Sequence, residues 1–308
     1  MKKLWLSVLL VALLLLTISP TAVLAKSDGV GQVNATDVQI VKKVTLHGPA
    51  AKGGKTVPTA ATGSLGDLLS NDAKKYAIVI GINDYPGTGS DLQYTVADAD
   101  EMSNVLLNTY KFDDVIELTD AAATYNAIKT AIAGVKASAK SGDEVVFFFS
   151  GHGAKGKAAD GDKNNVDQSI VVQEVVQGKL QFAFIWDGEL VQWFSNFTAT
   201  RIVFVFDSCL AGGMSVLNAP DRVVCMASTI NGMSLEGAAW GGGHGQFTYY
   251  FAEEGIESGL AGKYDYNGDG ILYQPQDVSV EEAFDYAKAN CKSQTPTIAD
   301  GFDKDLLP

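Results

Sequence analysis

Arginine, histidine and cysteine are scarce in this sequence of 308 residues, which contains three histidines and three cysteines. Only two of its 23 basic residues are arginines, and the formal net charge is −13. Because an acidic surface repels phosphate backbones, we expect no nucleic-acid partner. We expect instead a cationic one, such as a divalent metal or a substrate that carries lysine or arginine. Three cysteines without CxxC spacing are too few for a disulfide framework.

Proline is also infrequent, with 8 residues, and the 32 glycines follow no period, which excludes a collagen-like chain. The apolar share of 46% and the charged share of 19% exclude a disordered one. The composition is therefore that of a globular protein. Its length allows one large domain or two small ones, since a domain usually takes about 100–200 residues.

The longest apolar run stands at the N-terminus. Lys2 and Lys3 precede it, it extends from residue 4 to residue 18, and Val23-Leu24-Ala25 offers small side chains for cleavage. This pattern predicts a secretory signal peptide over residues 1–25. Because the run is shorter than the roughly 20 residues of a transmembrane helix, we expect a secreted or extracytoplasmic protein with no membrane span after cleavage.

Residues 26–74 are rich in Ala, Gly, Thr, Ser and Lys and show no periodicity. We interpret them as a tail or pro-segment, with a linker or a strand laid on the domain as alternatives. His47 belongs to this segment.

From residue 75 onward, short apolar runs alternate with amphipathic helical segments, which is typical of an α/β fold. We expect one domain over residues 75–308, with a mostly parallel central sheet of about six strands flanked by helices on both faces, and a monomer. Strands are predicted at 76–82, 115–118, 144–149, 169–176, 179–184, 201–206 and 223–228, and helices at 95–110, 124–139, 187–197, 246–258 and 280–290.

Two glycine-bearing turns each follow one of the buried strands. One is Ser150-Gly151-His152-Gly153, and the other begins Asp207-Ser208-Cys209. Ligands of parallel α/β sheets bind beyond the carboxyl ends of the strands. We therefore expect His152 and Cys209 to face each other at that edge.

A cysteine and a histidine in this arrangement favour nucleophilic catalysis. The histidine lowers the pKa of the thiol and later protonates a leaving amine. The backbone N–H groups of Gly153 and Cys209 are the candidate donors of an oxyanion hole. For each residue considered alone, a structural role is as good an interpretation as a catalytic one: Cys209 as a small buried hydrophobic residue and His152 as a structural loop histidine. His244, in a glycine loop, is assigned a loop role.

Several motifs together are typical of one family. They are Tyr76–Ile82, Asp98-Ala-Asp100, Phe147-Phe-Phe-Ser-Gly-His-Gly153, Val203-Phe-Val-Phe-Asp-Ser-Cys209, Gly245-Gln-Phe-Thr-Tyr-Tyr250 and Gln294-Thr-Pro-Thr-Ile298. Over roughly residues 75–305 the chain resembles the caspase-like clan of cysteine peptidases, and most closely its prokaryotic metacaspase-type members. The resemblance implies a caspase-like sandwich and a dyad in which Cys209 attacks the peptide carbonyl and His152 transfers protons.

The substrate site is predicted from charge and from the resemblance together. A site for aspartate needs arginines, but Arg201 opens a strand at the end away from the expected site. Asp207, by contrast, lies two residues before Cys209, and Asp98 begins a predicted helix. The resemblance implies that Asp98 and Asp207, helped by Ser150, bind a basic P1 side chain. We expect cleavage of proteins or peptides after Arg or Lys.

Calcium is the one cofactor that the sequence suggests, and no organic cofactor is expected. Asp265, Asn267, Asp269 and Ile271 match the first half of an EF-hand loop, with glycine at its sixth position. Position 12 is Gln276 instead of glutamate, so Asp277, Glu281 or Glu282 would have to supply the missing carboxylate. An Asn-Gly/Asp-Gly turn without an ion is the alternative.

A second acidic stretch follows the histidine and contains Asp160, Asp162 and Asp167. The resemblance implies an activating calcium in a comparable region, and this stretch is a weaker candidate for it.

The leading hypothesis is a secreted thiol protease of metacaspase type, activated by calcium and able to cut itself at flexible lysines. A legumain- or gingipain-like peptidase of the same clan is one alternative. A catalytically inactive, calcium-binding interaction module is another.

Overall fold

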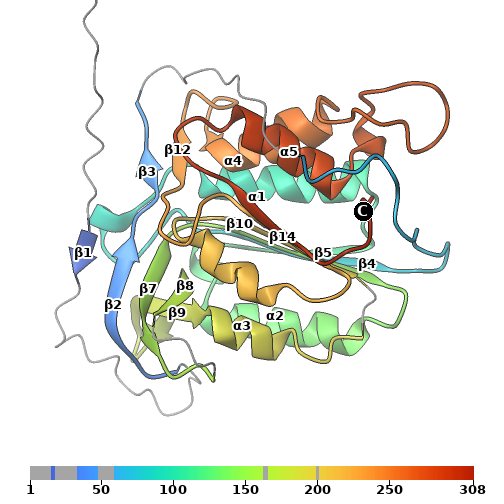
Figure 1. Ribbon diagram of the computed structural model, residues 1–308. Coiled ribbons are helices and arrows are strands. Elements are labelled where there is room, and N and C mark those ends of the chain that lie inside the picture. The colour runs from blue at the N-terminus through green and yellow to red at the C-terminus, as the bar shows by residue number, and fades with distance from the viewer. Residues whose placement is uncertain (1–14, 18–32, 48–58, 162–165, 199–200) are drawn as a thin grey trace, which may run out of the picture.

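The structure is a computed structural model in which residues 15–17, 33–47, 59–161, 166–198 and 201–308 are described (Figure 1). Its centre is a six-stranded sheet with the order β14-β11-β10-β6-β4-β5. The strands are β4 (Lys75–Gly81), β5 (Asp114–Thr119), β6 (Glu144–Ser150), β10 (Arg201–Asp207), β11 (Arg222–Met226) and β14 (Thr297–Asp300). Neighbouring strands are parallel except for β14, which pairs antiparallel with β11. The predicted α/β architecture is confirmed.

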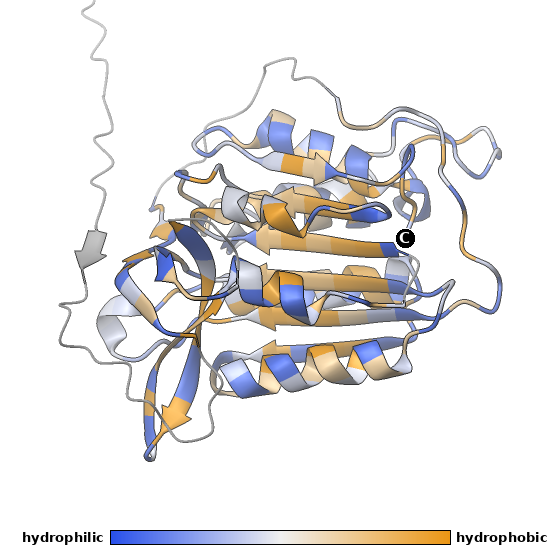
Figure 2. Ribbon diagram, turned by 60° about the horizontal axis from the view of Figure 1, so that its bottom comes forward, coloured by the Kyte–Doolittle hydropathy of each residue, from blue (hydrophilic) through white to orange (hydrophobic). Residues whose placement is uncertain are grey.

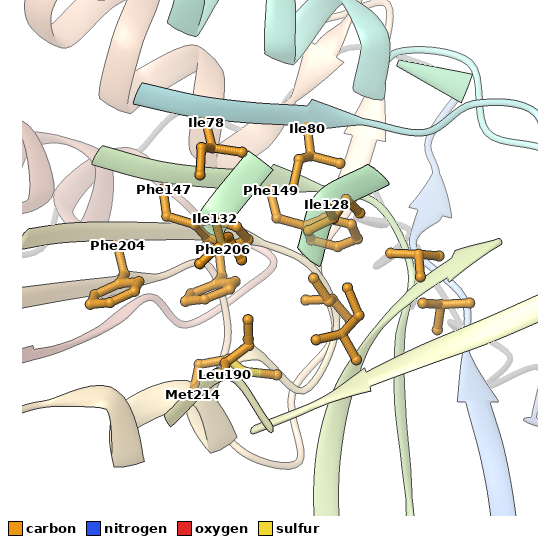
Figure 3. Close-up of a cluster of buried hydrophobic side chains, with 14 of the residues drawn as sticks. Ile78, Ile80, Ile128, Ile132, Phe147, Phe149, Leu190, Phe204, Phe206 and Met214 are labelled. Atoms are coloured by element: carbon orange, nitrogen blue, oxygen red, sulfur yellow. The ribbon is translucent and has the colours of Figure 1, made fainter. Parts of the chain in front are cut away.

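Alternate residues of the central strands pack against helices on opposite faces. Phe147 and Phe149 of β6 belong to one buried cluster, which Figure 3 shows, whereas Val146 and Phe148 belong to the other. Both faces are therefore covered, and the central strands are mostly apolar (Figure 2).

The helices form two layers. Three elements pack against the first cluster: α2 (Tyr125–Ser138), α3 (Asp187–Trp193) and the 3₁₀ segment η4 (Ala211–Leu217). Five pack against the second: α1 (Thr95–Asn104), the π-helical η2 (Val105–Thr109) and η5 (Tyr249–Glu257), α4 (Gln246–Thr248) and α5 (Val280–Asn290). Short 3₁₀ turns are η1 (Thr88–Ser90), η3 (Asp120–Ala122) and η6 (Pro275–Asp277). Among the described helices none is long and apolar enough to cross a bilayer.

A second sheet stands at the carboxyl ends of the central strands (Figure 1). Its order is β1-β2-β7-β8-β9, with β1 (Leu15–Thr17), β2 (Ala35–Val41), β7 (Gly153–Ala158), β8 (Asp167–Val176) and β9 (Lys179–Trp186). β8 and β9, which pair antiparallel, match the strands predicted at 169–176 and 179–184. β7 is not among the predicted strands, because its glycines, alanines and lysines have low strand propensity. It becomes a strand by pairing with β2 on one side and β8 on the other.

The segment before residue 75 contributes strands to the domain. β2 pairs with β7, and β3 (Val44–Thr45) joins β12 (Leu235–Gly237) and β13 (His244–Gly245) in a small sheet. The predicted signal peptide lies outside the described residues, apart from residues 15–17.

Candidate active site

The imidazole of His152 is held in a buried position just beyond the end of β6. Its ring stacks on Tyr85, with ring centroids 4.6 Å apart, and its backbone N–H donates to the Tyr85 hydroxyl at 3.0 Å. The same hydroxyl donates to the carbonyl of Val171 at 3.0 Å. Nε2 of His152 lies 2.7 Å from the carbonyl oxygen of Ser90. Since that oxygen only accepts, Nε2 carries the proton and Nδ1 is left as the acceptor.

Cys209 lies just beyond the end of β10 and is almost completely buried. Its Sγ accepts a hydrogen bond from the backbone N–H of Ser234 at 3.1 Å. Its thiol donates to the carbonyl oxygen of Lys42 at 3.3 Å.

One peptide group connects the two side chains. The Lys42 carbonyl contacts Cys209 Sγ at 3.3 Å, and the Lys43 N–H donates to Nδ1 of His152 at 3.0 Å. Burial raises the pKa of the Cys209 thiol to about 12 and lowers the pKa of His152 to about 3. In this arrangement both groups are therefore neutral, as a thiol and an imidazole.

The three predicted substrate-binding residues surround a single buried ammonium group, that of Lys43. Lys43 Nζ lies 3.3 Å from Oδ2 of Asp98, 3.0 Å from Oδ1 of Asp207 and 3.0 Å from Oγ of Ser150. The Ser150 hydroxyl in turn donates to Asp98 at 2.6 Å. We call Asp98, Ser150 and Asp207 the acidic site.

Charge balance explains why this ion group is stable away from water. Burial alone would lower the pKa of Lys43, but the charges of Asp207 and Asp98 raise it well above its usual range. Burial would likewise raise the pKa of Asp98, but the charge of Lys43 and hydrogen bonds from His244 and Ser150 lower it. The acidic site is therefore built to hold a cation.

Further side chains fix the two acids, and the sequence did not single these out. Thr248 donates to Oδ2 of Asp207 through its backbone N–H at 3.0 Å and its hydroxyl at 2.8 Å. Ser234 donates to Oδ1 of Asp207. His244, to which a loop role was assigned, lies 3.2 Å from Asp98 through Nδ1 and 3.3 Å from Glu253 through Nε2.

Neither arginine takes part in this site. Arg201 is at the opposite end of its strand, where it pairs with Glu144. Arg222 donates to the backbone carbonyls of Phe194 and Leu217. Among the described residues, the acids near Cys209 are therefore matched by Lys43 and by His244, and not by an arginine.

The two expected oxyanion residues are in direct contact. A Cβ atom added to Gly153 would lie 1.9 Å from the carbonyl oxygen of Cys209, so only glycine fits there. This glycine lets the strand after His152 approach the turn that carries the thiol.

The predicted calcium loop is exposed and folds around its first residue. Asp265 accepts hydrogen bonds from the backbone N–H groups of Gly268 at 2.8 Å and of Gly270 at 2.7 Å. Asp269 accepts from the N–H of Ile271 at 2.8 Å. The side chain of Asn267 accepts from the N–H of Asp269 at 2.9 Å.

Of the three acids considered as replacements for Gln276, two have other partners. Glu281 accepts from the N–H of Leu306, and Glu282 caps the start of its own helix at Ser279. Asp277 is the one near the loop. Burial raises its pKa, whereas a hydrogen bond from the backbone of Asn267 lowers it.

The other acidic stretch is the only group of three or more potential metal-ligating side chains found among the described residues. Asp160, Asp167 and Asp187 are all buried, and one carboxylate oxygen from each lies within 4.8 Å of the others. Sequence reasoning did not include Asp187, which begins α3. Asp162 lies outside the described residues.

Comparison with known proteins finds a family model that matches nearly half of the chain. Residues 75–219 match the family model described as metacaspase, peptidase C14 domain. Metacaspase-1 of Schizosaccharomyces pombe is 32% identical over 152 residues, which cover 46% of this chain and 34% of the relative. Metacaspase-4 of Arabidopsis thaliana is 32% identical over 150 residues, with the same coverage of 46% and 34%. The chain thus spans about a third of the length of these curated relatives.

A crystal structure of a protein from Geobacter sulfurreducens has a similar fold. Its TM-score is 0.53 at 18% sequence identity, and the match covers 75% of this chain and 94% of that one.

Proposed function

From the match of residues 75–219 to the metacaspase, peptidase C14 family model and from the similarity to metacaspases, we propose that the chain is a metacaspase-type cysteine endopeptidase acting through Cys209 and His152. The observation that carries this proposal is the shared peptide group. Sγ of Cys209 and Nδ1 of His152 each contact one side of the Lys42–Lys43 peptide, at 3.3 and 3.0 Å. Acyl transfer requires a nucleophile and an acid–base group that contact the same peptide group.

In the proposed reaction, His152 takes the thiol proton and Sγ of Cys209 forms a bond to the substrate carbonyl carbon. The negative charge that develops on the carbonyl oxygen is stabilised by the backbone N–H groups of Gly153 and Cys209. His152 then gives its proton to the leaving amine as the C–N bond breaks. Water hydrolyses the acyl-enzyme and restores the thiol.

The proposed specificity is for Lys or Arg at P1. The acidic site already binds a lysine side chain, and its two carboxylates are buried and held by Ser150, Thr248 and His244. A P1 aspartate would bring a third negative charge to the same place, which is strongly unfavourable in a buried site.

Calcium activation is proposed through the buried acidic cluster of Asp160, Asp167 and Asp187. Oxygen ligands suit calcium, and a divalent cation would offset the repulsion between three buried carboxylates. Asp167 begins β8, and Asp187 begins α3. An ion there would tie the connection that follows His152 to the helix layer.

The exposed loop of Asp265, Asn267, Asp269 and Ile271, with Asp277 beside it, is the second proposed calcium site. Its hydrogen bonds to Asp265 already form the turn that an EF-hand loop needs.

Export, a monomeric state and self-processing complete the proposal. Export is inferred from the N-terminal sequence alone. The candidate lysines for self-cleavage are Lys52, Lys55, Lys74, Lys75, Lys155, Lys157 and Lys163. Lys52, Lys55 and Lys163 lie outside the described residues, Lys75 begins β4, Lys155 and Lys157 lie in β7, and Lys74 lies outside any strand. Because a strand has to leave its sheet before a protease can bind it, the segments outside strands are the favoured sites.

The test is turnover of fluorogenic peptides that differ only at P1, with Lys, Arg, Asn or Asp, by the purified chain with and without calcium. We expect turnover of the Lys and Arg peptides alone, and none from the Cys209→Ala variant with its fold intact. Turnover of the Asn peptide would favour a legumain-like enzyme. Equal turnover by the variant would reject Cys209 as the nucleophile.

A further inference from the structure

The segment from Val41 to Leu46 crosses the whole candidate active site. It leaves the second sheet at the end of β2 and enters the small sheet as β3. Between these strands, Lys43 extends into the acidic site, where its side chain is completely buried. The backbone of this segment thus covers Cys209 and His152, and its Lys43 side chain fills the acidic site.

The direction of this segment is opposite to that of a peptide being cleaved. For cleavage after a residue held in the acidic site, that residue must present its own carbonyl carbon to Cys209. The next residue must then present its nitrogen to His152. Lys43 instead presents its own nitrogen to His152, and the carbonyl at Cys209 belongs to the preceding residue, Lys42.

Contacts beyond the dyad hold the segment in this direction. The N–H of Val44 donates to the Ser234 carbonyl at 3.1 Å, and the N–H of Leu46 donates to the Glu236 carbonyl at 2.7 Å. β3 accordingly runs parallel to β12. The hydroxyl of Thr45 adds a hydrogen bond of 2.6 Å to the Glu236 carboxylate.

The Lys42–Lys43 bond itself is badly placed for cleavage. Its N–H donates to Nδ1 of His152, so the imidazole has no proton to give to that nitrogen from Nδ1. The side chain that precedes this bond, that of Lys42, turns away and donates to the carbonyl of Gly89. A cut there would need a P1 side chain outside the acidic site.

We propose that residues 41–46 are a built-in inhibitor that binds in reverse, so that Lys43 fills the acidic site without being cut, and that the peptidase becomes active when this segment leaves. This inference rests on the proposed function, because it concerns the same site. The ligand class is an extended, lysine-bearing peptide in reverse orientation. A substrate with P1 lysine replaces one ammonium by another, so the exchange leaves the buried charge balance unchanged.

The experiment compares three full-length variants with the natural chain. Val44→Pro removes the backbone N–H that donates to the Ser234 carbonyl, and it keeps the Lys43 side chain and the acidic site. Lys43→Ala removes the ammonium. Lys157→Ala is the matched control, because Lys157 pairs with Asp37 of β2 at the surface, outside the site. Circular dichroism checks that each variant is folded.

Two readouts are recorded for each protein. One is turnover of a P1-lysine peptide, and the other is the rate at which iodoacetamide alkylates Cys209, mapped by mass spectrometry. We call the form in which residues 41–46 have left the site the open form. We expect both rates to rise at least about tenfold in Val44→Pro and Lys43→Ala, because this is the rise that opening produces when the open form is a tenth or less of the natural chain. The control should match the natural chain.

The outcomes separate the two proposals. Faster alkylation without turnover in any variant would reject the peptidase but keep the covering segment. Equal turnover and equal alkylation in all four proteins would overturn the inhibitor. Fragments of the natural chain that end at Lys42 or Lys43 would overturn the reverse orientation, because we expect both bonds to stay intact. If Lys43→Ala does not fold, Val44→Pro alone decides.

Discussion

The hydroxyl of Tyr85 offers a sharp test of how the imidazole of His152 is positioned. Burial raises the pKa of Tyr85 above its usual range, so the phenol is neutral and both accepts and donates. It accepts from the His152 N–H and donates to the Val171 carbonyl, each at 3.0 Å. Tyr85→Phe removes only this oxygen and keeps the stacked ring.

The expected cost follows from what the missing oxygen leaves behind. His152 and Val171 are both buried, so neither freed group reaches water easily. A buried donor without a partner costs about 1–3 kcal/mol. A carbonyl, which has a second lone pair, costs less. We expect Tyr85→Phe to lower the free energy of unfolding by about 2–4 kcal/mol. We also expect kcat/KM to fall, because the imidazole is held less firmly.

Urea unfolding followed by circular dichroism measures the first effect, and peptide turnover measures the second. Tyr249→Phe is the matched control. Its hydroxyl donates to Glu254 where both side chains are partly exposed, so water can replace the lost partner and the free energy of unfolding should change by clearly less than in Tyr85→Phe. A loss in Tyr85→Phe as small as that of the control would refute the role assigned to this hydroxyl.

Three further predictions concern the acidic site and the metal. Asp98→Asn removes one of the two carboxylates that contact the lysine ammonium, and kcat/KM for a P1-lysine peptide should fall at least about 30-fold. Asp100→Asn, an exposed acid on the same helix, should leave it unchanged, and an equal fall in both variants would contradict the assignment. Asp167→Asn should remove most of the rise in melting temperature that calcium produces, whereas Asp269→Asn should remove little of it; the opposite pattern would make the exposed loop the main calcium site. Burial lowers the pKa of His244, but its hydrogen bond to Asp98 and the charges of Asp98, Glu253 and Glu101 raise it above 6.5. The stability that protonated His244 contributes is complete below pH 6.5, the pKa of the unfolded state, and is lost as the pH rises through the higher pKa of the folded state. The natural chain should therefore exceed His244→Gln in stability at pH 6 and lose that advantage toward pH 9, and a difference independent of pH would count against the ion pair.

The central sheet was predictable because its signal is local. Buried parallel strands are continuous apolar runs, and each run shows where its carboxyl end lies. His152 and Cys209 follow directly from that, since strand ends of one sheet meet at one edge. Asp207 is found in the same way. Asp98 needed the charge argument and the resemblance, because an acid in the first turn of a helix is common.

The covering segment was not predictable, because its strands depend on distant partners. β2 and β3 have no periodic pattern of their own and form only against β7 and β12. Lys43 is one of several lysines in a segment that was interpreted as a tail. The signal that was present is a charge imbalance: two acids beside Cys209 in a chain almost without arginine require a cation, and a neighbouring lysine of the same chain supplies it.

Tyr85 and His244 were missed for a related reason. Tyr85 lies in a loop and His244 in the two-residue strand β13, and the role of each follows only from the residues that fold against it.

The most direct test of the central claim is covalent labelling with a peptidyl acyloxymethyl ketone, a reagent that modifies an active cysteine nucleophile once its P1 side chain is bound. The natural chain is incubated with the P1-lysine reagent or the P1-aspartate reagent, and the labelled residue is identified by mass spectrometry. We expect a label on Cys209 with the lysine reagent alone. A label on Cys225 or Cys291, or equal labelling by both reagents, would contradict it.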